Sequence, residues 1–126
     1  VYKMDYARML RFHQERGAAA TLAAIEVPLQ EGRQFGVVAI DEQERVTGFQ
    51  EKPKDPPCIP GSPDLALASM GVYIFDTDVL IRALESDAVQ PTTHDFGKDI
   101  IPALIHQVPV YAYRFYDENK KASKYW

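Results

Sequence analysis

Glu51-Lys52-Pro53 is the tripeptide whose residue types most directly suggest chemistry. The lysine stands at the end of a predicted strand, and open α/β sheets place their ligand sites at strand ends. Lysine binds phosphate as a compact point charge, and the adjacent Glu51 carboxylate can accept hydrogen bonds from sugar hydroxyls. The tripeptide therefore predicts a site for phosphate and hydroxyl groups. The alternative is a solvated strand end.

Two further segments place polar groups inside a predicted strand and at the start of a predicted helix. Ser69, Gly71 and Tyr73 share one face of a strand by its two-residue period, which leaves room for a polar ligand. The alternative is a tyrosine packed in the core with its hydroxyl satisfied. Asp95, in the run from His94 to Asp99, opens a predicted helix, where it could also be a simple cap.

Nucleophilic and metal-based chemistries find little support in the sequence. Cys58 lies among prolines with no histidine nearby, which is typical of an inert loop thiol. His13, His94 and His106 are too scattered for metal-ligand spacing, and we expect His13 and His106 at helix surfaces or boundaries. The sequence contains no G-x-G-x-x-G run, P-loop or zinc motif.

Strands and helices alternate in the apolar pattern that must position these residues. We expect helices at 2–16, 78–86 and 96–106 and strands at 20–28, 36–41, 46–51, 66–75 and 110–116. One face of the first helix would carry Tyr6, Met9, Leu10 and His13. Asp76 suits an N-cap, and Pro102 should kink or divide the last helix. The second and third strands should form a hairpin, so the pattern predicts an α/β fold with a mixed sheet.

The composition is that of one globular domain. The chain has 126 residues, of which 46% are hydrophobic and 25% charged, which excludes intrinsic disorder, collagen and coiled coils. The segment from Pro53 to Pro63 holds five prolines, and we interpret it as a surface loop rather than a linker. A net charge of −4 argues against nucleic-acid or membrane partners, and a single cysteine favours a reduced, cytoplasmic setting.

Five segments taken in order resemble one enzyme family. They are residues 2–6 (YKMDY), 35–37 (FGV), 51–53 (EKP), 68–75 (ASMGVYIF) and 94–102 (HDFGKDIIP). Together they are similar to the middle of the catalytic domain of glucose-1-phosphate adenylyltransferases, the ADP-glucose pyrophosphorylases. The resemblance spans the whole chain. It implies a Rossmann-like mixed sheet flanked by helices, as one part of a sugar-phosphate nucleotidyltransferase domain.

The resemblance also implies a reaction and a set of substrate-binding residues. ATP and glucose 1-phosphate would give ADP-glucose and pyrophosphate, with Mg²⁺ as cofactor, in glycogen biosynthesis. Lys52 would bind the sugar phosphate and Glu51 the glucose hydroxyls. The rest of the glucose pocket would be lined by Gly36, Ser69, Tyr73, Asp95 and Phe96. Trp126 matches the tryptophan of the family's Trp-Arg-Asp-Val-Gly motif.

The family's remaining catalytic parts have no counterpart in residues 1–126. The glycine-rich ATP loop, both metal-binding aspartates and the C-terminal β-helix are missing from this stretch. We therefore expect no catalytic and no metal-binding residue within the chain, and no turnover by the chain alone. The implied parent is an allosteric homotetramer whose effector sites use other regions.

Two alternatives remain at this point. One is a related nucleotidyltransferase that uses UTP, dTTP or GTP, because the loop that reads the base is not part of this sequence. The other is a non-catalytic folding or assembly unit, in which exposed sheet edges promote a dimer or a domain swap.

Overall fold

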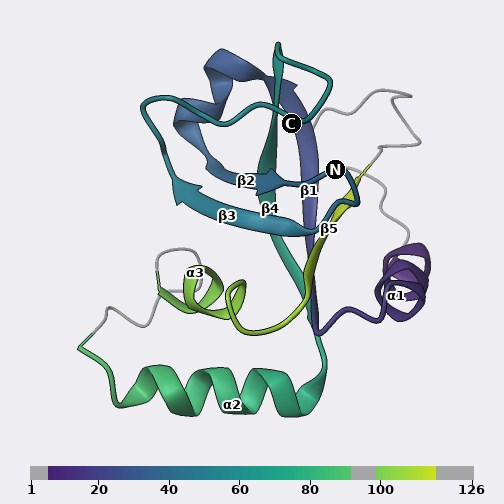
Figure 1. Cartoon of the computed structure of the whole chain (residues 1–126), viewed down its shortest axis with the longest axis vertical. Helices are drawn as coiled ribbons and strands as arrows, with labels where there is room; N and C mark the ends of the chain where they lie inside the picture. The colour runs from purple at the N-terminus through teal and green to yellow at the C-terminus, as the bar shows by residue number, and fades with distance from the viewer. Residues whose placement is uncertain (1–5, 92–98, 116–126) are drawn as a thin grey trace.

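The computed structural model describes residues 6–91 and 99–115, and these form one mixed sheet with helices on both faces (Figure 1). The elements in chain order are α1 (Tyr6–Glu15), β1 (Ala20–Pro28), the 3-10 helix η1 (Leu29–Gln34), β2 (Gly36–Ile40), β3 (Val46–Glu51), β4 (Leu65–Phe75), α2 (Thr77–Ala88), α3 (Ile101–Leu104) and β5 (Val110–Arg114). The five predicted strands are all present, and the α/β class is confirmed.

The sheet has the order β3-β2-β4-β1-β5. β1 pairs in parallel with β5, whereas all other pairings are antiparallel, which confirms the predicted mixed sheet. Seven of the nine residues of β1 are fully buried, as expected for a central strand with both faces covered.

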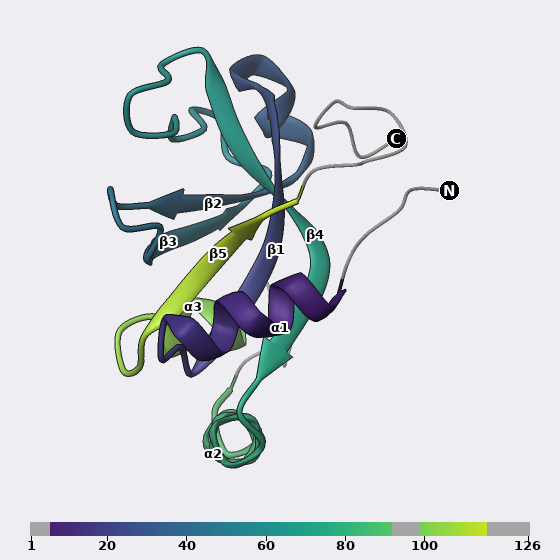
Figure 2. The ribbon, with the colours of Figure 1, turned by 90° about the vertical axis from the view of Figure 1, so that its right-hand side faces the viewer.

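Each face of the sheet supports its own apolar core. Met9 of α1 packs with Ile25, Val37 and Phe115 on the face that we call the α1 face. Leu22, Val38, Leu67 and Val110 point to the opposite face, where Val79 of α2 and Ile101 of α3 cover them. We call this the α3 face. In Figure 1, α1 and α3 lie on opposite sides of the strands. In the turned view of Figure 2, α1 lies in front of them.

The predicted β2–β3 hairpin is confirmed, but its attachment is unusual. β2 pairs with β4 at only two positions, Val37↔Ala68 and Val38↔Leu67. The turn of the hairpin instead crosses to the opposite edge of the sheet, where Arg45 forms an isolated bridge with Tyr111 of β5 (Figure 1). The hairpin therefore closes over the α3 face rather than extending the sheet outward.

The predicted apolar face of α1 is only half right. Met9 and His13 are buried, whereas Tyr6 is 59% and Leu10 45% exposed. The helix is rotated so that Phe12 contacts the sheet instead, with its ring 5.4 Å from that of Tyr113. The aromatic residues Tyr111 and Tyr113 of β5 therefore pack against the side of α1 that carries Phe12.

Two predicted features of the helices can be compared with the structure. The described part of the last helix runs from Ile101 to Leu104, with Pro102 in its first turn, where the missing N–H of proline costs nothing. Asp76 lies at the predicted N-cap of α2, but its side chain makes no capping hydrogen bond. The remainder of the predicted 96–106 helix up to residue 98 lies outside the described residues.

Candidate functional site

Four of the predicted site residues lie on the α3 face of three adjacent strands. Gly36 of β2 is paired directly with Glu51 of β3, two residues along from the Val38↔Phe49 pair that packs into the core of this face. Ser69 and Tyr73 of β4 pair with Ala24 and Leu22 of β1, both of which belong to the same core. The fold thus gathers these residues from segments far apart in sequence.

Gly36 and Glu51 are in direct contact. A Cβ placed on Gly36 would lie 2.8 Å from Cζ of Phe49 and 3.2 Å from Oε2 of Glu51. Only glycine therefore lets the carboxylate rest against the β2 backbone without displacing the Phe49 ring. Gly36 therefore leaves room for the Phe49 ring and for the exposed Glu51 carboxylate.

Lys52 follows β3 in a strained backbone conformation. Its φ is +47°, in the left-handed region that costs a non-glycine residue about 1–2 kcal/mol. The Lys52 N–H donates to the carbonyl of Phe35 at 2.9 Å, which holds this conformation. The chain thus turns sharply between the paired Glu51 and the buried Pro53, and it leaves the lysine side chain in solvent. Strain of this kind persists only where the surroundings fix it, and it is frequent at functional positions.

The Ser69–Tyr73 segment contains a bulge that the two-residue period did not predict. Two steps along β1, from Leu22 to Ala24, oppose four steps along β4, from Tyr73 to Ser69. Gly71 takes a φ of +73° inside this bulge, and its N–H donates to Oγ of Ser69 at 3.3 Å. Ser69 and Tyr73 share the α3 face, but Gly71 is exposed and leaves the regular strand.

The environment of Tyr73 agrees in part with the alternative interpretation. Its half-buried ring packs against the core of the α3 face and lies 6.1 Å from the ring of Phe75. Asp95, Phe96 and Trp126, the other predicted pocket residues, lie outside the described residues. The structure thus brings Gly36, Glu51, Ser69 and Tyr73 to the α3 face, and Lys52 follows Glu51 directly in the chain.

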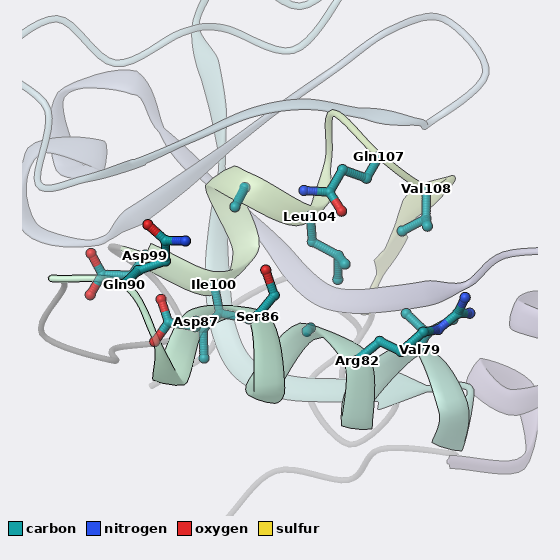
Figure 3. Close-up of a pocket in the computed structure, with 12 residues that line it drawn as sticks. Val79, Arg82, Ser86, Asp87, Gln90, Asp99, Ile100, Leu104, Gln107 and Val108 are labelled. Carbon is teal, nitrogen blue, oxygen red and sulfur yellow. The ribbon is translucent and has the colours of Figure 1, made fainter.

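A cavity of about 610 Å³ lies elsewhere, between α2 and α3 (Figure 3). Ser86 and Asp87 of α2 face Ile100 and Leu104 across it, and Gln107 also lines it. None of the predicted site residues that the structure describes lines this cavity. It is therefore separate from the site on β2, β3 and β4.

His13 departs most clearly from its prediction. Instead of lying at the helix surface, it is 5% exposed, with Nδ1 2.7 Å from Oγ1 of Thr21 and Nε2 2.8 Å from Oδ1 of Asp76. A carboxylate can only accept, so Nε2 carries the proton, and in the neutral ring Nδ1 accepts from the Thr21 hydroxyl. Because Thr21 and His13 are both buried, the Thr21 hydroxyl is closed to solvent, whereas the Asp76 end of this Thr–His–Asp chain is half exposed. It joins α1, β1 and the start of α2.

The predictions for the other potentially reactive residues agree better with the structure. Cys58 is an exposed free thiol in the proline-rich loop, and His106 is exposed just after α3. Within residues 6–91 and 99–115, no three His, Cys, Asp or Glu side chains are grouped to hold a metal ion. The acidic side chains of these residues therefore form no three-ligand group that would fit Mg²⁺. In the same part of the chain, no helix is long and apolar enough to cross a membrane.

The class of protein to which this mixed α/β sheet and its strand-end lysine–glutamate pair belong follows from comparison with known proteins. The nucleotidyl transferase family model matches residues 1–126, and the chain belongs to this family. Among curated proteins it is similar to glucose-1-phosphate adenylyltransferases. It is 55% identical to that of Dechloromonas aromatica over 93% of the chain, and 53% identical to glucose-1-phosphate adenylyltransferase 2 of Alkalilimnicola ehrlichii over the whole chain.

A third relative, glucose-1-phosphate adenylyltransferase 2 of Vibrio cholerae, is 50% identical over the whole chain. The matched regions make up 27%, 30% and 32% of the lengths of these three proteins. The chain thus spans less than a third of the relatives that it matches. The family resemblance predicted from the five segments is confirmed.

Proposed function

We propose that the full-length protein containing this chain forms ADP-glucose and pyrophosphate from ATP and glucose 1-phosphate. The chain would supply the part that binds the sugar phosphate. The observation that carries the proposal is the Glu51–Lys52 pair. Its carboxylate is seated against Gly36 and its lysine is held at a φ of +47°, in a chain about half identical to glucose-1-phosphate adenylyltransferases.

In this proposal the chain positions one substrate and neutralises its charge. The Lys52 ammonium group binds the phosphate of glucose 1-phosphate, and the Glu51 carboxylate accepts hydrogen bonds from glucose hydroxyls. A phosphate oxygen then attacks the α-phosphorus of ATP, the new P–O bond forms, and pyrophosphate leaves in line. Because the Lys52 backbone is held at a φ of +47°, its exposed side chain leaves the end of β3 from a fixed point and reaches the phosphate through its flexible stem.

The remaining predicted residues would complete the glucose pocket. Ser69 and Tyr73 offer hydroxyl groups on the same sheet face as Glu51. Asp95, Phe96 and Trp126 are assigned to the pocket by the family resemblance alone. We propose Mg²⁺ as a cofactor of the full-length protein, held by carboxylates outside this chain, where it would neutralise phosphate charge.

The test is a substrate panel with the full-length protein. Pyrophosphate release is measured with glucose 1-phosphate and each of ATP, UTP, dTTP and GTP. Release with ATP at a kcat/KM at least about ten-fold above the other nucleotides is expected. Release with UTP, dTTP or GTP instead would reassign the protein to another sugar-phosphate nucleotidyltransferase. No release with any nucleotide would refute the proposed reaction.

We further infer the setting of the protein from its relatives. Synthesis of ADP-glucose fits an allosteric homotetramer in the cytoplasm that serves glycogen biosynthesis. The single exposed cysteine and the net charge of −4 support a reduced compartment without nucleic-acid or membrane partners.

A further inference from the structure

Strand β3, which ends at Glu51, has a residue with strained backbone just before it and another just after it. Glu44, with a φ of +68°, lies just before β3, and Lys52, with a φ of +47°, lies just after it. Among the described residues these two are the non-glycine positions with positive φ. Such conformations persist only where neighbouring groups determine them, which indicates that β3 is held at both ends.

The sheet itself holds the hairpin weakly. β3 is an edge strand that pairs with β2, and β2 pairs with β4 at only two positions. A hairpin attached to the sheet over so short a stretch could tilt about that attachment, carrying Glu51 and Lys52 with it. Besides the core packing of Val38 and Val46, the contacts at the turn end therefore help to set its orientation.

Glu44 is the centre of those contacts. Its Oε1 accepts from Nη2 of Arg16 at 2.8 Å, and its Oε2 lies 3.6 Å from Nε of Arg114. Its carbonyl also accepts from the N–H of Ala112 in β5 at 3.0 Å. Arg16 comes from the end of α1 and Arg114 from β5, so Glu44 joins the turn to both.

The two arginines are themselves fixed. Nη1 of Arg16 donates to the carbonyl of Gln43 at 2.6 Å, and its guanidinium lies 4.6 Å from the ring centroid of Phe12. Arg114 donates to Glu26 at 3.3 Å. Nε of Arg114 is buried and makes no hydrogen bond within the described part of the chain, so the nearby Glu44 carboxylate compensates its charge.

We propose that Arg16 and Glu44 are positioning residues for the sugar-phosphate site, because they anchor the turn end of the hairpin that carries Glu51 and Lys52. The six-residue strand β3 separates the two ends by roughly 20 Å, so a small tilt at the turn displaces Lys52 appreciably. The inference rests on the proposed function. It assigns Arg16 and Glu44 no contact with substrate.

The test compares Glu44→Asn with Glu42→Asn in the full-length protein. Asparagine tolerates positive φ, but its side chain is too short to replace the Glu44 contacts. Glu42 is exposed on the same turn, so its variant removes an equal charge from the same place. Glu44→Asn should raise the KM for glucose 1-phosphate about five-fold or more, with the KM for ATP changed less than about two-fold. Glu42→Asn should leave both unchanged.

Arg16 provides the conservative comparison. Arg16→Met should reproduce the Glu44→Asn effect. Arg16→Lys keeps the charge near Glu44 but cannot hold Gln43 and Glu44 with one planar group, so its KM should lie between those of Arg16→Met and the wild type. Hydrogen exchange gives a readout independent of activity. The amides of residues 46–52 should exchange about ten-fold faster in Glu44→Asn, while those of β1 stay protected.

The outcomes separate this inference from the proposed function. If the wild-type protein is active and Glu44→Asn matches Glu42→Asn in KM and exchange, the inference alone is wrong. It is also overturned if both KM values and the thermal midpoint change together, because that is general destabilisation. A wild-type protein that releases no pyrophosphate refutes the proposed function, and the exchange measurement then decides whether Glu44 anchors the hairpin.

Discussion

At the scale of single residues, a steric constraint and a buried hydrogen-bonded chain determine what can be changed. Gly36 has no room for a side chain beside Phe49 and Glu51, whereas Gly48, in the facing strand of the same hairpin, has Ala39 Cβ as its nearest neighbour at 3.6 Å. His13 is fixed by Thr21 and Asp76. The glycine supports the proposed site, and the histidine supports the fold.

Gly36→Ala should therefore impair the proposed sugar-phosphate site. The new methyl group must displace the Phe49 ring or the Glu51 carboxylate, so the KM for glucose 1-phosphate should rise about five-fold or more in steady-state assays. Gly48→Ala is the control, because its Cβ would make only ordinary contact. Equal kinetics for the two variants would show that the Gly36 contact is unimportant.

His13→Ala should destabilise the protein without a matching role in binding. It leaves the Thr21 hydroxyl buried without its partner and removes the link to Asp76, which should cost about 2–3 kcal/mol in urea unfolding. His106→Ala, at an exposed position, should change stability by less than about 0.5 kcal/mol. A cost for His13→Ala as small as that of the control would contradict the assignment.

At the scale of elements, the sequence predicts what depends on local pattern. Short apolar runs, alternating at 20–28 and 110–116, placed the strands, and the polar turn at 42–45 placed the hairpin. The β4 bulge was missed because Gly71 fits an uninterrupted strand pattern, and its positive φ is visible only in three dimensions. The His13 link was missed because Asp76 is 63 residues away in sequence.

The bulge gives a prediction at this scale. Gly71 and Gly61 both have positive φ, and a Cβ on either would meet nothing within 4 Å. Alanine at each position should therefore cost a similar amount of backbone strain, about 1–2 kcal/mol in denaturation. Only Gly71→Ala should also raise the KM for glucose 1-phosphate, because it shifts Ser69. An unchanged KM for glucose 1-phosphate in Gly71→Ala would show that the bulge does not position the sugar-phosphate site.

At the scale of the whole molecule, the fold unites segments that the sequence could only place in order. The register of β2, β3 and β4 brings Gly36, Glu51, Ser69 and Tyr73 to one face, and their membership of one glucose pocket stays a prediction. The return of the hairpin turn to β5, and the cavity between α2 and α3, depend on tertiary packing that no local pattern encodes.

The chain spans less than a third of the relatives that it matches, so binding and turnover are separable predictions. The isolated 126-residue chain should release no pyrophosphate from ATP and glucose 1-phosphate, because the proposed ATP-binding and metal-binding parts lie elsewhere. The same coupled assay on the full-length protein is the positive control. Turnover by the isolated chain would contradict this division.

The most direct test of the account compares Lys52→Ala with Lys54→Ala in the full-length protein. Both lysines are exposed in the same loop region, but only Lys52 is proposed to bind the sugar phosphate. Lys52→Ala should raise the KM for glucose 1-phosphate by about a hundred-fold, with the KM for ATP nearly unchanged, because a charge-assisted phosphate contact is lost. Lys54→Ala should behave as wild type. An unchanged KM for glucose 1-phosphate in Lys52→Ala would contradict the account.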